Sequence, residues 1–172
     1  MIAVETATLA DAETLSAFAE ASFVDTFGHI YDPADLAAFL ADWNPPDRLA
    51  AQIADPDWTI ALVRDAQRAI LGFVKLGPID FELPAGQPHD GATELHQLYV
   101  GEAAKGTGVA AALIEWGIAW ARERASILYL SVFGENHRAQ AFYRRYGFVD
   151  VGRNAFRVGN HIDEDRIWRL DL

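Results

Sequence analysis

The stretch KGTGVA, Lys105 to Ala110, stands between a strand-like segment and a long apolar pattern with helical spacing. Its two glycines, Gly106 and Gly108, can adopt positive φ angles and leave room for a ligand to approach the backbone. The N-terminus of a helix also presents unpaired N–H groups and the positive end of the helix dipole. The stretch therefore predicts a loop that binds a phosphate group through backbone N–H groups.

Two other kinds of phosphate loop fit this stretch less well. A P-loop carries Lys and then Ser or Thr after its last glycine, whereas Lys105 precedes Gly106 here. A dinucleotide-binding fingerprint is closer, because Gly106, Gly108 and Ala111 match G-x-G-x-x-A. Glu135 is then available for the ribose. That motif directly follows an apolar parallel strand, however, and here the preceding strand is polar and a short segment intervenes. A dinucleotide-binding module that takes NAD is therefore the less favoured alternative.

Hydrophobic spacing and turn residues predict strands and helices along the whole chain. Asp32 before Pro33 is a typical helix start. Asn136 is a good N-cap, and Gly147 followed by Phe148 fits a Schellman end. We expect strands at residues 2–7, 58–64, 69–77, 94–100, 127–133, 148–152 and 165–172, helices at residues 9–23 and starting near 32, 45, 108 and 136, and a loop at residues 78–93.

This order of elements predicts the fold class. The first half of the chain combines helices with a β-hairpin, and the second half alternates strands and helices. The simplest packing of such a set is a mixed sheet with helices on both faces. We therefore expect one α/β domain over residues 1–172, a length that suits a single domain.

The composition excludes several classes of function. The chain has 172 residues, no cysteine and a formal net charge of −11. Without cysteine there is no thiol nucleophile, zinc finger or disulfide framework. An acidic chain repels nucleic acid and suits a cationic small molecule. The N-terminus lacks the basic region of a signal peptide, and charges interrupt every apolar stretch, so we expect a cytoplasmic protein that has no membrane partner.

Two motifs at this spacing together resemble the GNAT acyltransferase superfamily. The family's pyrophosphate loop reads Arg/Gln-x-x-Gly-x-Gly/Ala, which Lys105–Ala110 matches except that Lys replaces Arg or Gln. Lysine keeps the positive charge but loses the planar fork of arginine. The second motif is N…A..FY..YGF, from Asn136 to Phe148. The resemblance covers most of the chain and implies a mixed, mostly antiparallel central sheet with a splayed central strand pair, and acetyl-CoA as cosubstrate without a metal.

The resemblance also implies which residues bind the cosubstrate. The glycine loop would hold the pyrophosphate, Asn136 would contact the pantetheine arm, and the backbone of the central strand would pair with the pantetheine amides and supply the oxyanion donor. Asn136 can serve as an N-cap at the same time. The implied cofactor-binding residues are Leu98, Tyr99, Val100, Lys105, Gly106, Thr107, Gly108, Val109, Ala110, Asn136 and Tyr143.

Acetyl transfer from a thioester to an amine needs an acid for the departing thiolate and a base for the amine, whose reference pKa is about 10.4. Tyr143 matches the tyrosine of the family's FY helix, which the resemblance places near the CoA sulfur, and it is the candidate acid. Glu94 opens the central strand where many family members hold a carboxylate, and it is the candidate base. His96, two residues on, points to the same face and could share that role. Each of these residues could also be purely structural.

The acceptor site is expected in the N-terminal helices and the last loops. The stretch SFVDTFGHIYDPADLAAFL, residues 22–40, is similar to the N-terminal arm of bacterial spermidine/spermine N-acetyltransferases. Its Phe23, Asp25, Phe27, His29 and Tyr31 could line an aromatic, acidic pocket for an alkylammonium, or they could form an ordinary helical core. The predicted substrate-binding residues are Phe27, His29, Tyr31, Glu94 and His96.

The charged run Asp163–Asp165 adds negative charge before the last strand, although such runs usually form solvated turns.

Together these features predict an enzyme that transfers acetyl from acetyl-CoA to a primary amine, with a polyamine as the candidate acceptor, by direct attack in a ternary complex. A protein N-terminal or lysine acetyltransferase of the same fold is the alternative enzyme, and a non-catalytic acetyl-CoA sensor is the alternative of another class. Homodimer formation is an expectation from the family resemblance alone.

Overall fold

The computed structural model describes all residues of the chain, 1–172, and contains one seven-stranded sheet with five α-helices. The strand order is β1-β2-β3-β4-β5-β7-β6, and every neighbouring pair is antiparallel except β4 and β5. This confirms the predicted mixed, mostly antiparallel sheet. The elements are β1 (Glu5–Thr6), α1 (Ala12–Phe27), α2 (Pro33–Trp43), α3 (Pro46–Ala54), β2 (Thr59–Arg64), β3 (Ile70–Gly77), β4 (Ala92–Val100), α4 (Val109–Arg122), β5 (Ile127–Phe133), α5 (His137–Arg145), β6 (Val149–Val158) and β7 (His161–Asp171), with short 3-10 turns η1 (Leu9–Asp11), η2 (Gly28–Ile30) and η3 (Glu102–Ala104).

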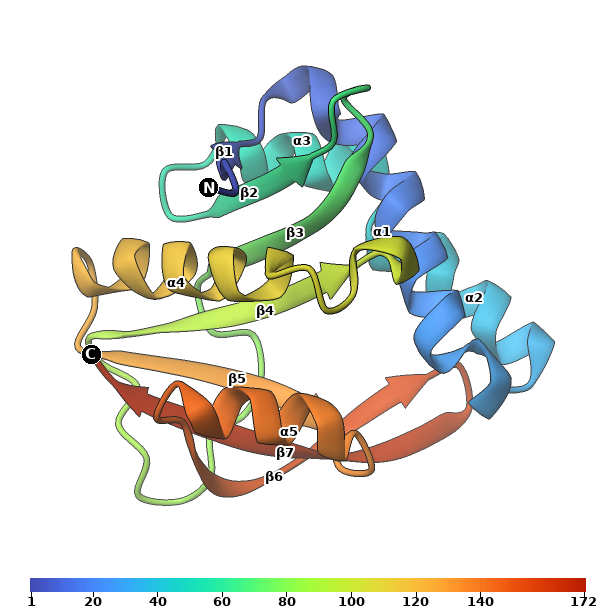
Figure 1. Ribbon diagram of the computed structural model, residues 1–172. Helices are drawn as coiled ribbons and strands as arrows, with labels where there is room; N and C mark the ends of the chain where they lie inside the picture. The colour runs from blue at the N-terminus through green and yellow to red at the C-terminus, as the bar shows by residue number, and fades with distance from the viewer.

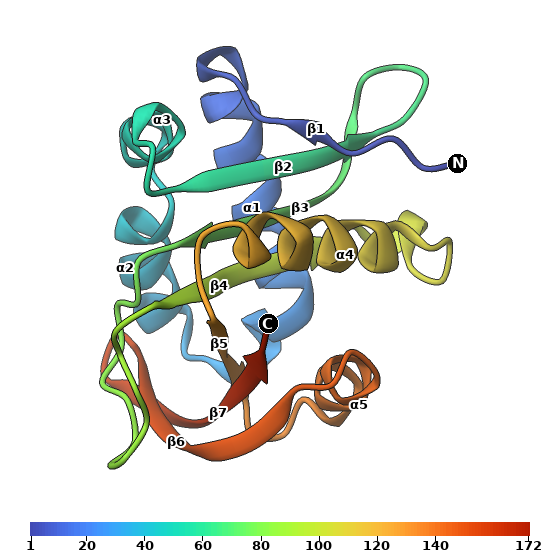
Figure 2. The same ribbon diagram turned by 90° about the vertical axis from the view of Figure 1, so that its left-hand side faces the viewer.

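Helices cover both faces of the sheet, as predicted (Figures 1 and 2). We call the side covered by α4 and α5 the cofactor face and the side covered by α1, α2 and α3 the acceptor face. On the cofactor face, Leu113 and Ile114 of α4 are fully buried against strand residues such as Leu95. On the acceptor face, Leu15 and Leu49 pack on the inner strands in a second core. Each helix therefore buries one apolar stripe against the sheet.

Local sequence signals set several helix ends. The Asp32 carboxylate accepts a hydrogen bond from the N–H of Ala34 at 2.9 Å, so it is the N-cap that its position before proline predicts. Asn136 caps α5 in the same way through Ala139, at 3.1 Å. Gly147 has a φ of +91°, which fits the predicted left-handed helix end.

Strand β4 carries an irregularity that affects the site. Its register with β3 shifts between Lys75, opposite Gln97, and Leu76, opposite Leu95, so His96 is an extra residue. A bulge of this kind interrupts the alternation of side chains. As a result Leu95 and Leu98 both contact the cofactor-face core although they are three residues apart.

Some expected bounds are wrong. The first helix runs four residues beyond Phe23, and the first strand is shorter than residues 2–7. The larger error concerns the last hairpin, in which β6 and β7 are much longer than the predicted strands and pair from Val149–Arg169 to Val158–His161. Residues 163–165 lie inside β7, and Asp163 and Asp165 are each only 6% exposed. The expectation of a solvated turn is therefore wrong for these two residues, because a strand places alternate side chains on its buried face.

Candidate active site

The predicted phosphate loop has the geometry of an anion site. Gly106 and Gly108 have φ angles of +79° and +94°, a region that side chains other than glycine rarely adopt. Helix α4 starts directly after them at Val109. The N–H groups of these three residues and of Ala110 and Ala111 donate to no protein acceptor. Five adjacent donors at the positive end of a helix can hold an anion such as a pyrophosphate.

The two side chains of the loop that can form polar contacts are engaged within the protein. Lys105 forms an ion pair with Glu102, which lies three residues earlier. The hydroxyl of Thr107 donates to the carbonyl oxygen of Ala104 at 2.6 Å. The backbone therefore presents most of the free donors, and an anion would have to draw Lys105 away from Glu102.

Strands β4 and β5 separate beside this loop. They pair in parallel only from Ala92–Ile127 to Leu95–Leu130, and the rest of both strands is unpaired on this side. Figure 1 shows the two strands diverging toward α1 and α2. This is the splayed central pair that the resemblance implies. The splay leaves the edge of β4 beyond Leu95 open to a ligand.

Alternation along β4 indicates which backbone groups face the opening. The N–H of Gly101 donates to Leu71 of β3 at 2.9 Å, so the backbone of Tyr99, two residues earlier, also points to β3. The N–H and C=O groups of Leu98 and Val100 then point toward the splay. Of the three predicted backbone contacts, these two residues are placed to pair with a ligand.

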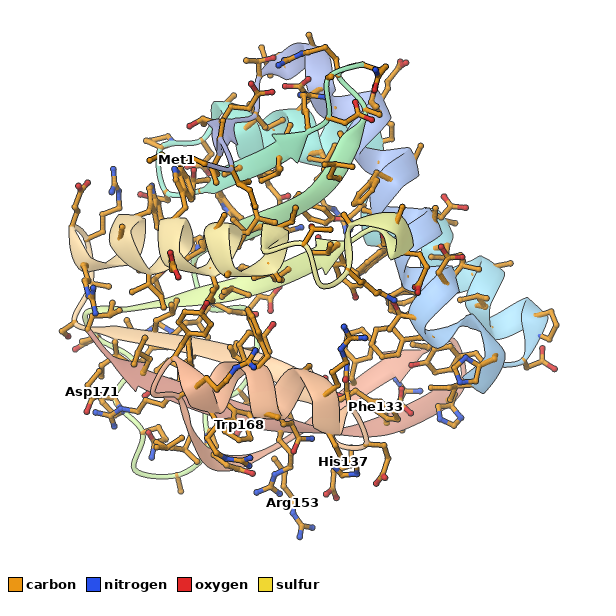
Figure 3. All side chains as sticks on the ribbon, in the orientation of Figure 1. Met1, Phe133, His137, Arg153, Trp168 and Asp171 are labelled. Atoms are coloured by element: carbon orange, nitrogen blue, oxygen red, sulfur yellow. The ribbon has the colours of Figure 1, made fainter.

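Tyr143 and Asn136 lie on the β5 side of the opening, in α5 and at its N-terminus. Tyr143 is 8% exposed and packs edge to face on Phe142 and Phe148, at 5.5 and 5.7 Å between ring centroids. Burial raises the pKa of its phenol, so the hydroxyl is fully protonated at neutral pH. Figure 3 shows α5 above Trp168 of β7, which anchors the helix to the sheet.

Glu94, His96 and Asp80 form a polar cluster on the acceptor face, in which the side chains of Glu94 and His96 are buried and that of Asp80 is exposed. Glu94 Oε1 lies 3.3 Å from His96 Nδ1, and Asp80 Oδ2 lies 3.4 Å from the same nitrogen. Glu94 Oε2 accepts from the N–H of Asp80 at 3.0 Å, and His96 Nε2 lies 2.8 Å from the carbonyl oxygen of Pro78. Since a carbonyl only accepts, Nε2 carries a proton and Nδ1 faces the two carboxyl groups. The prediction that Glu94 and His96 share a face is confirmed.

The surroundings of Glu94 control its protonation. The side chain is 5% exposed, and burial together with the negative charge of Asp80 raises its pKa to about 9. Asp80, by contrast, has a lowered pKa, chiefly because it bonds to His96. At neutral pH the Glu94 carboxyl is therefore protonated and the Asp80 carboxylate is ionised. Because Asp80, Glu94 and His96 each place a ligand atom within 4.8 Å of the others, they could also ligate a cation, and metal-free chemistry stays a prediction.

Comparisons with known proteins agree with this arrangement. The model of the acetyltransferase (GNAT) family matches residues 16–148. The chain belongs to the GNAT acetyltransferase family. It is 31% identical over 165 residues to an uncharacterized N-acetyltransferase of Mycobacterium tuberculosis, a match that covers 95% of this chain and 99% of the relative. This family membership confirms the prediction of an acetyl-CoA-dependent N-acetyltransferase.

A second relative and a solved structure extend the match. The acetyltransferase is 26% identical to an uncharacterized N-acetyltransferase of Lactobacillus delbrueckii, over 91% of this chain and 89% of the relative. Its fold is similar to the crystal structure of PaiA N-acetyltransferase from Thermoplasma acidophilum in complex with coenzyme A, with a TM-score of 0.78, 18% identity and coverage of 100% and 99% of the two chains. None of the helices of the acetyltransferase combines the length and the apolar character needed to cross a membrane.

The predicted acceptor arm is only partly assembled as expected. Phe23 lies 5.2 Å from Phe27 and 6.0 Å from Tyr31, ring centroid to centroid, and the three belong to an aromatic cluster with residues of α2 and β6. Asp25 and His29 are exposed and lie outside this cluster. Phe27 and Tyr31 therefore stay good candidates for the acceptor site, whereas a role for His29 stays a prediction without a supporting contact.

Three further residues contribute to this face, of which the sequence predicts Asp163 and Asp165 only as part of a negative cluster and does not predict Asp80. Asp80 comes from the loop that was expected only to be irregular, and no pattern in the sequence connects it with Glu94. Asp163 and Asp165 could have been found from the alternation of charged and buried positions before Ile167, had that run been assigned to a strand. A period of two is the signal of a strand whether the inward residues are polar or apolar.

The raised pKa of Glu94 predicts a pH-dependent stability. A group whose pKa is higher in the folded protein favours folding while it is protonated, and this contribution is lost as pH rises from about 4.5 to about 9. Glu94→Gln should lack this loss, so the wild type should lose stability relative to the variant as pH rises from 5 to 9. The expected slope is at most about 1.4 kcal/mol per pH unit.

Urea denaturation followed by circular dichroism at several pH values measures this difference. Glu13→Gln is the matched control, because Glu13 is exposed on α1 and should show no such divergence. Parallel pH profiles for the wild type and Glu94→Gln would show that Glu94 ionises normally in the folded protein.

Proposed function

We propose that the acetyltransferase moves an acetyl group from acetyl-CoA to a primary amine, by direct attack within a ternary complex, and that a polyamine is the natural class of acceptor. The observation that carries the proposal is the set of free N–H groups of Gly106 and of Gly108 to Ala111 beside the opening between β4 and β5. The loop suits the pyrophosphate, and the open strand edge suits the amides of the pantetheine arm. Coenzyme A in the similar PaiA structure supports this assignment.

The residues around the opening supply what the reaction needs. The amine nitrogen attacks the thioester carbonyl carbon, and the N–H of Leu98 or Val100 donates to the oxygen that becomes negative. The carbon–sulfur bond then breaks, and Tyr143 gives its proton to the thiolate. No residue is required as an acyl carrier, because the amine and the thioester meet in one complex.

Glu94 is the proposed base, with His96 as its partner. The carboxyl can accept the amine proton, directly or through water, only when it is ionised. With a pKa of about 9 it is ionised mainly at alkaline pH, where more of the amine is also neutral. His96 and Asp80 then provide hydrogen bonds through which the proton can leave. The rate should therefore rise with pH toward about 9.

The aromatic and acidic character of the acceptor face supports a cationic acceptor. Phe27 and Tyr31 belong to an aromatic cluster, and the chain has a formal net charge of −11. Aromatic rings and negative charge attract alkylammonium groups. A polyamine fits both features, whereas a protein acceptor would need an additional docking surface.

The first experiment is thiol release from acetyl-CoA in the presence of spermidine, spermine, simple alkylamines and short peptides. Turnover with at least one amine, with the acetylated amine identified by mass spectrometry, is the expected result. Turnover with peptides alone would replace the polyamine with a protein acceptor. Cofactor binding without turnover for any acceptor would favour an acetyl-CoA sensor and contradict the proposal.

Gly108→Val should weaken or abolish the binding of CoA. A valine at a φ of +94° is strained, and its Cβ would approach Ile2 Cδ1 to 3.3 Å, so the loop would have to change the conformation that presents its free N–H groups. Calorimetric titration with CoA should show affinity lower by about tenfold or more, which is at least about 1.4 kcal/mol. Gly86→Val is the control, because Gly86 has a similar φ of +82° with open space around it, in the loop before β4. Unchanged CoA affinity in a folded Gly108→Val protein would refute the loop assignment.

Tyr143→Phe should lower kcat by roughly 100-fold and leave CoA affinity nearly unchanged, because it removes a proton donor without changing packing. Tyr146→Phe is the matched control, since Tyr146 lies three residues on and its hydroxyl makes only a long contact, 3.5 Å, with Glu115. Steady-state kinetics and CoA titration of both variants test the assignment. A wild-type kcat in Tyr143→Phe would remove Tyr143 as the acid.

A further inference from the structure

Two buried carboxyl groups lie on β7, apart from the Glu94 cluster. Asp163 and Asp165 are separated by one residue and therefore point to the same side of the strand. Asp163 accepts a hydrogen bond from the hydroxyl of Tyr31, so that side is the acceptor face. The residue between them, Glu164, is exposed and pairs with Arg153 at 3.3 Å on the other side. The fold thus holds two acids inward, close to the aromatic cluster of α1 and α2.

The carboxyl group of Asp165 is not satisfied by the protein. Its Oδ2 accepts from the hydroxyl of Ser131 at 3.1 Å, but its Oδ1 is buried and has no hydrogen-bond partner. No basic side chain forms an ion pair with it, whereas Asp163 has His161 at 2.9 Å. A buried carboxylate oxygen without a partner is costly for the folded protein. Such an atom is explained when a ligand completes its contacts.

The pair lies beside the opening where the reaction takes place. Asp165 is opposite Phe133 of β5, three residues beyond Leu130, at which the pairing with β4 ends. At about 3.3 Å per residue, it lies about 10 Å along the splayed part of β5. Phe133, labelled in Figure 3, meets Phe27 of α1 edge to face at 6.0 Å between ring centroids. The acids are therefore next to the aromatic cluster on the acceptor side of the opening.

Electrostatic coupling supports this placement. Tyr99 of β4 is half-buried, and its pKa is raised by desolvation and further by the nearby groups Tyr143, Tyr31 and Asp165. Tyr99 thus lies within electrostatic reach of Tyr143, the proposed proton donor, and of Asp165, one of the two buried carboxyl groups. Burial raises the pKa of Asp165 to about 6, so the carboxylate is still mainly ionised at neutral pH.

We propose that Asp163 and Asp165, together with Tyr31, bind an ammonium group of the acceptor that is not acetylated, so that the enzyme selects amines with at least two positive charges. The inference rests on the proposed acetyl transfer to an amine. A carboxylate next to an ammonium stabilises its protonated form, which is the opposite of what an attacking nitrogen needs. The pair is therefore suited to the nitrogen that stays charged while another nitrogen of the same molecule is acetylated.

A comparison of two acceptors of equal length tests the proposal on the wild type. Diaminobutane and butylamine have the same carbon chain and differ by one ammonium group. The kcat/KM for diaminobutane should exceed that for butylamine by about tenfold or more. Equal kcat/KM values for the two amines would overturn the proposal while leaving acetyl transfer to amines intact. Failure of both amines and of spermidine would instead count against the proposed function.

Asp165→Asn should remove most of this preference. We expect KM for diaminobutane and spermidine to rise by about tenfold or more, while kcat/KM for butylamine and the affinity for CoA change less than about twofold. Glu164→Gln is the matched control, because it removes a neighbouring charge on the outward side and should leave both amines unaffected. Tyr31→Phe, which removes one hydrogen bond from Asp163, should shift the same ratio in the same direction by a smaller factor.

Stability separates this role from a structural one. A carboxylate with an unpartnered buried oxygen disfavours the folded state at neutral pH, so Asp165→Asn should melt at the same temperature as the wild type or higher. Diaminobutane should raise the melting temperature of the wild type and have a much weaker effect on the variant.

An unstable variant with unchanged amine selectivity would assign Asp165 to the fold. An equal fall in kcat for mono- and diamines would assign it to proton transfer. Either result would overturn the proposal.

Discussion

The parting of β4 and β5 after Leu95 and Leu130 is the constraint on which the rest of the site depends. Paired strands satisfy one another's backbone groups, and separated strands leave them free. Here the freed groups of β4 face an opening that has the glycine loop at one side and α5 at the other. Had the two strands stayed paired to their ends, the glycine loop could still bind an anion, but β4 would have no free backbone edge facing the opening.

The opening persists because each strand is held from its other side. β4 stays paired with β3 as far as Val100, and β5 stays paired with β7 as far as Phe133. Each strand also carries a helix on the cofactor face, α4 over the β4 half and α5 over the β5 half, which Figure 1 shows as two separate helices on one side of the sheet. The packing of the two halves of the sheet thus offsets the free-energy cost of the unpaired strand edges.

The local features of the fold could be predicted from the sequence, because each depends on residues close together in the chain. The glycine loop, the Asp32 and Asn136 caps and the left-handed Gly147 are of this kind. The cofactor half of the site follows from them, since the loop and the helix it starts form one continuous segment. The family resemblance, rather than the residues alone, implied the splay.

The acceptor half could be predicted much less well, because it joins distant segments. Tyr31 meets Asp163 across 132 positions of sequence, and Asp80 meets Glu94 through an irregular loop. The expectation of a solvated turn at Asp163–Asp165 rests on the preference of charged residues for solvent. Tertiary packing nevertheless turns the side chains of Asp163 and Asp165 inward. His29 is the opposite case. The sequence predicts a substrate-binding role for this residue, but its side chain is exposed and lies outside the aromatic cluster.

The bulge at His96 has a consequence for how this enzyme can diversify. Strand β4 divides its side chains between the two faces of the sheet, with Leu95 and Leu98 in the cofactor-face core and Glu94, Gln97 and Tyr99 on the acceptor face. Leu95 and Gln97 pair with the consecutive residues Leu76 and Lys75, so the strand accommodates His96 without changing the faces that the side chains before and after it occupy. Substitutions that alter the acceptor face and substitutions that alter the cofactor-face core therefore occupy separate positions of one strand. A directed-evolution library could therefore vary the side chains of one face of β4 while it leaves those of the other face unchanged.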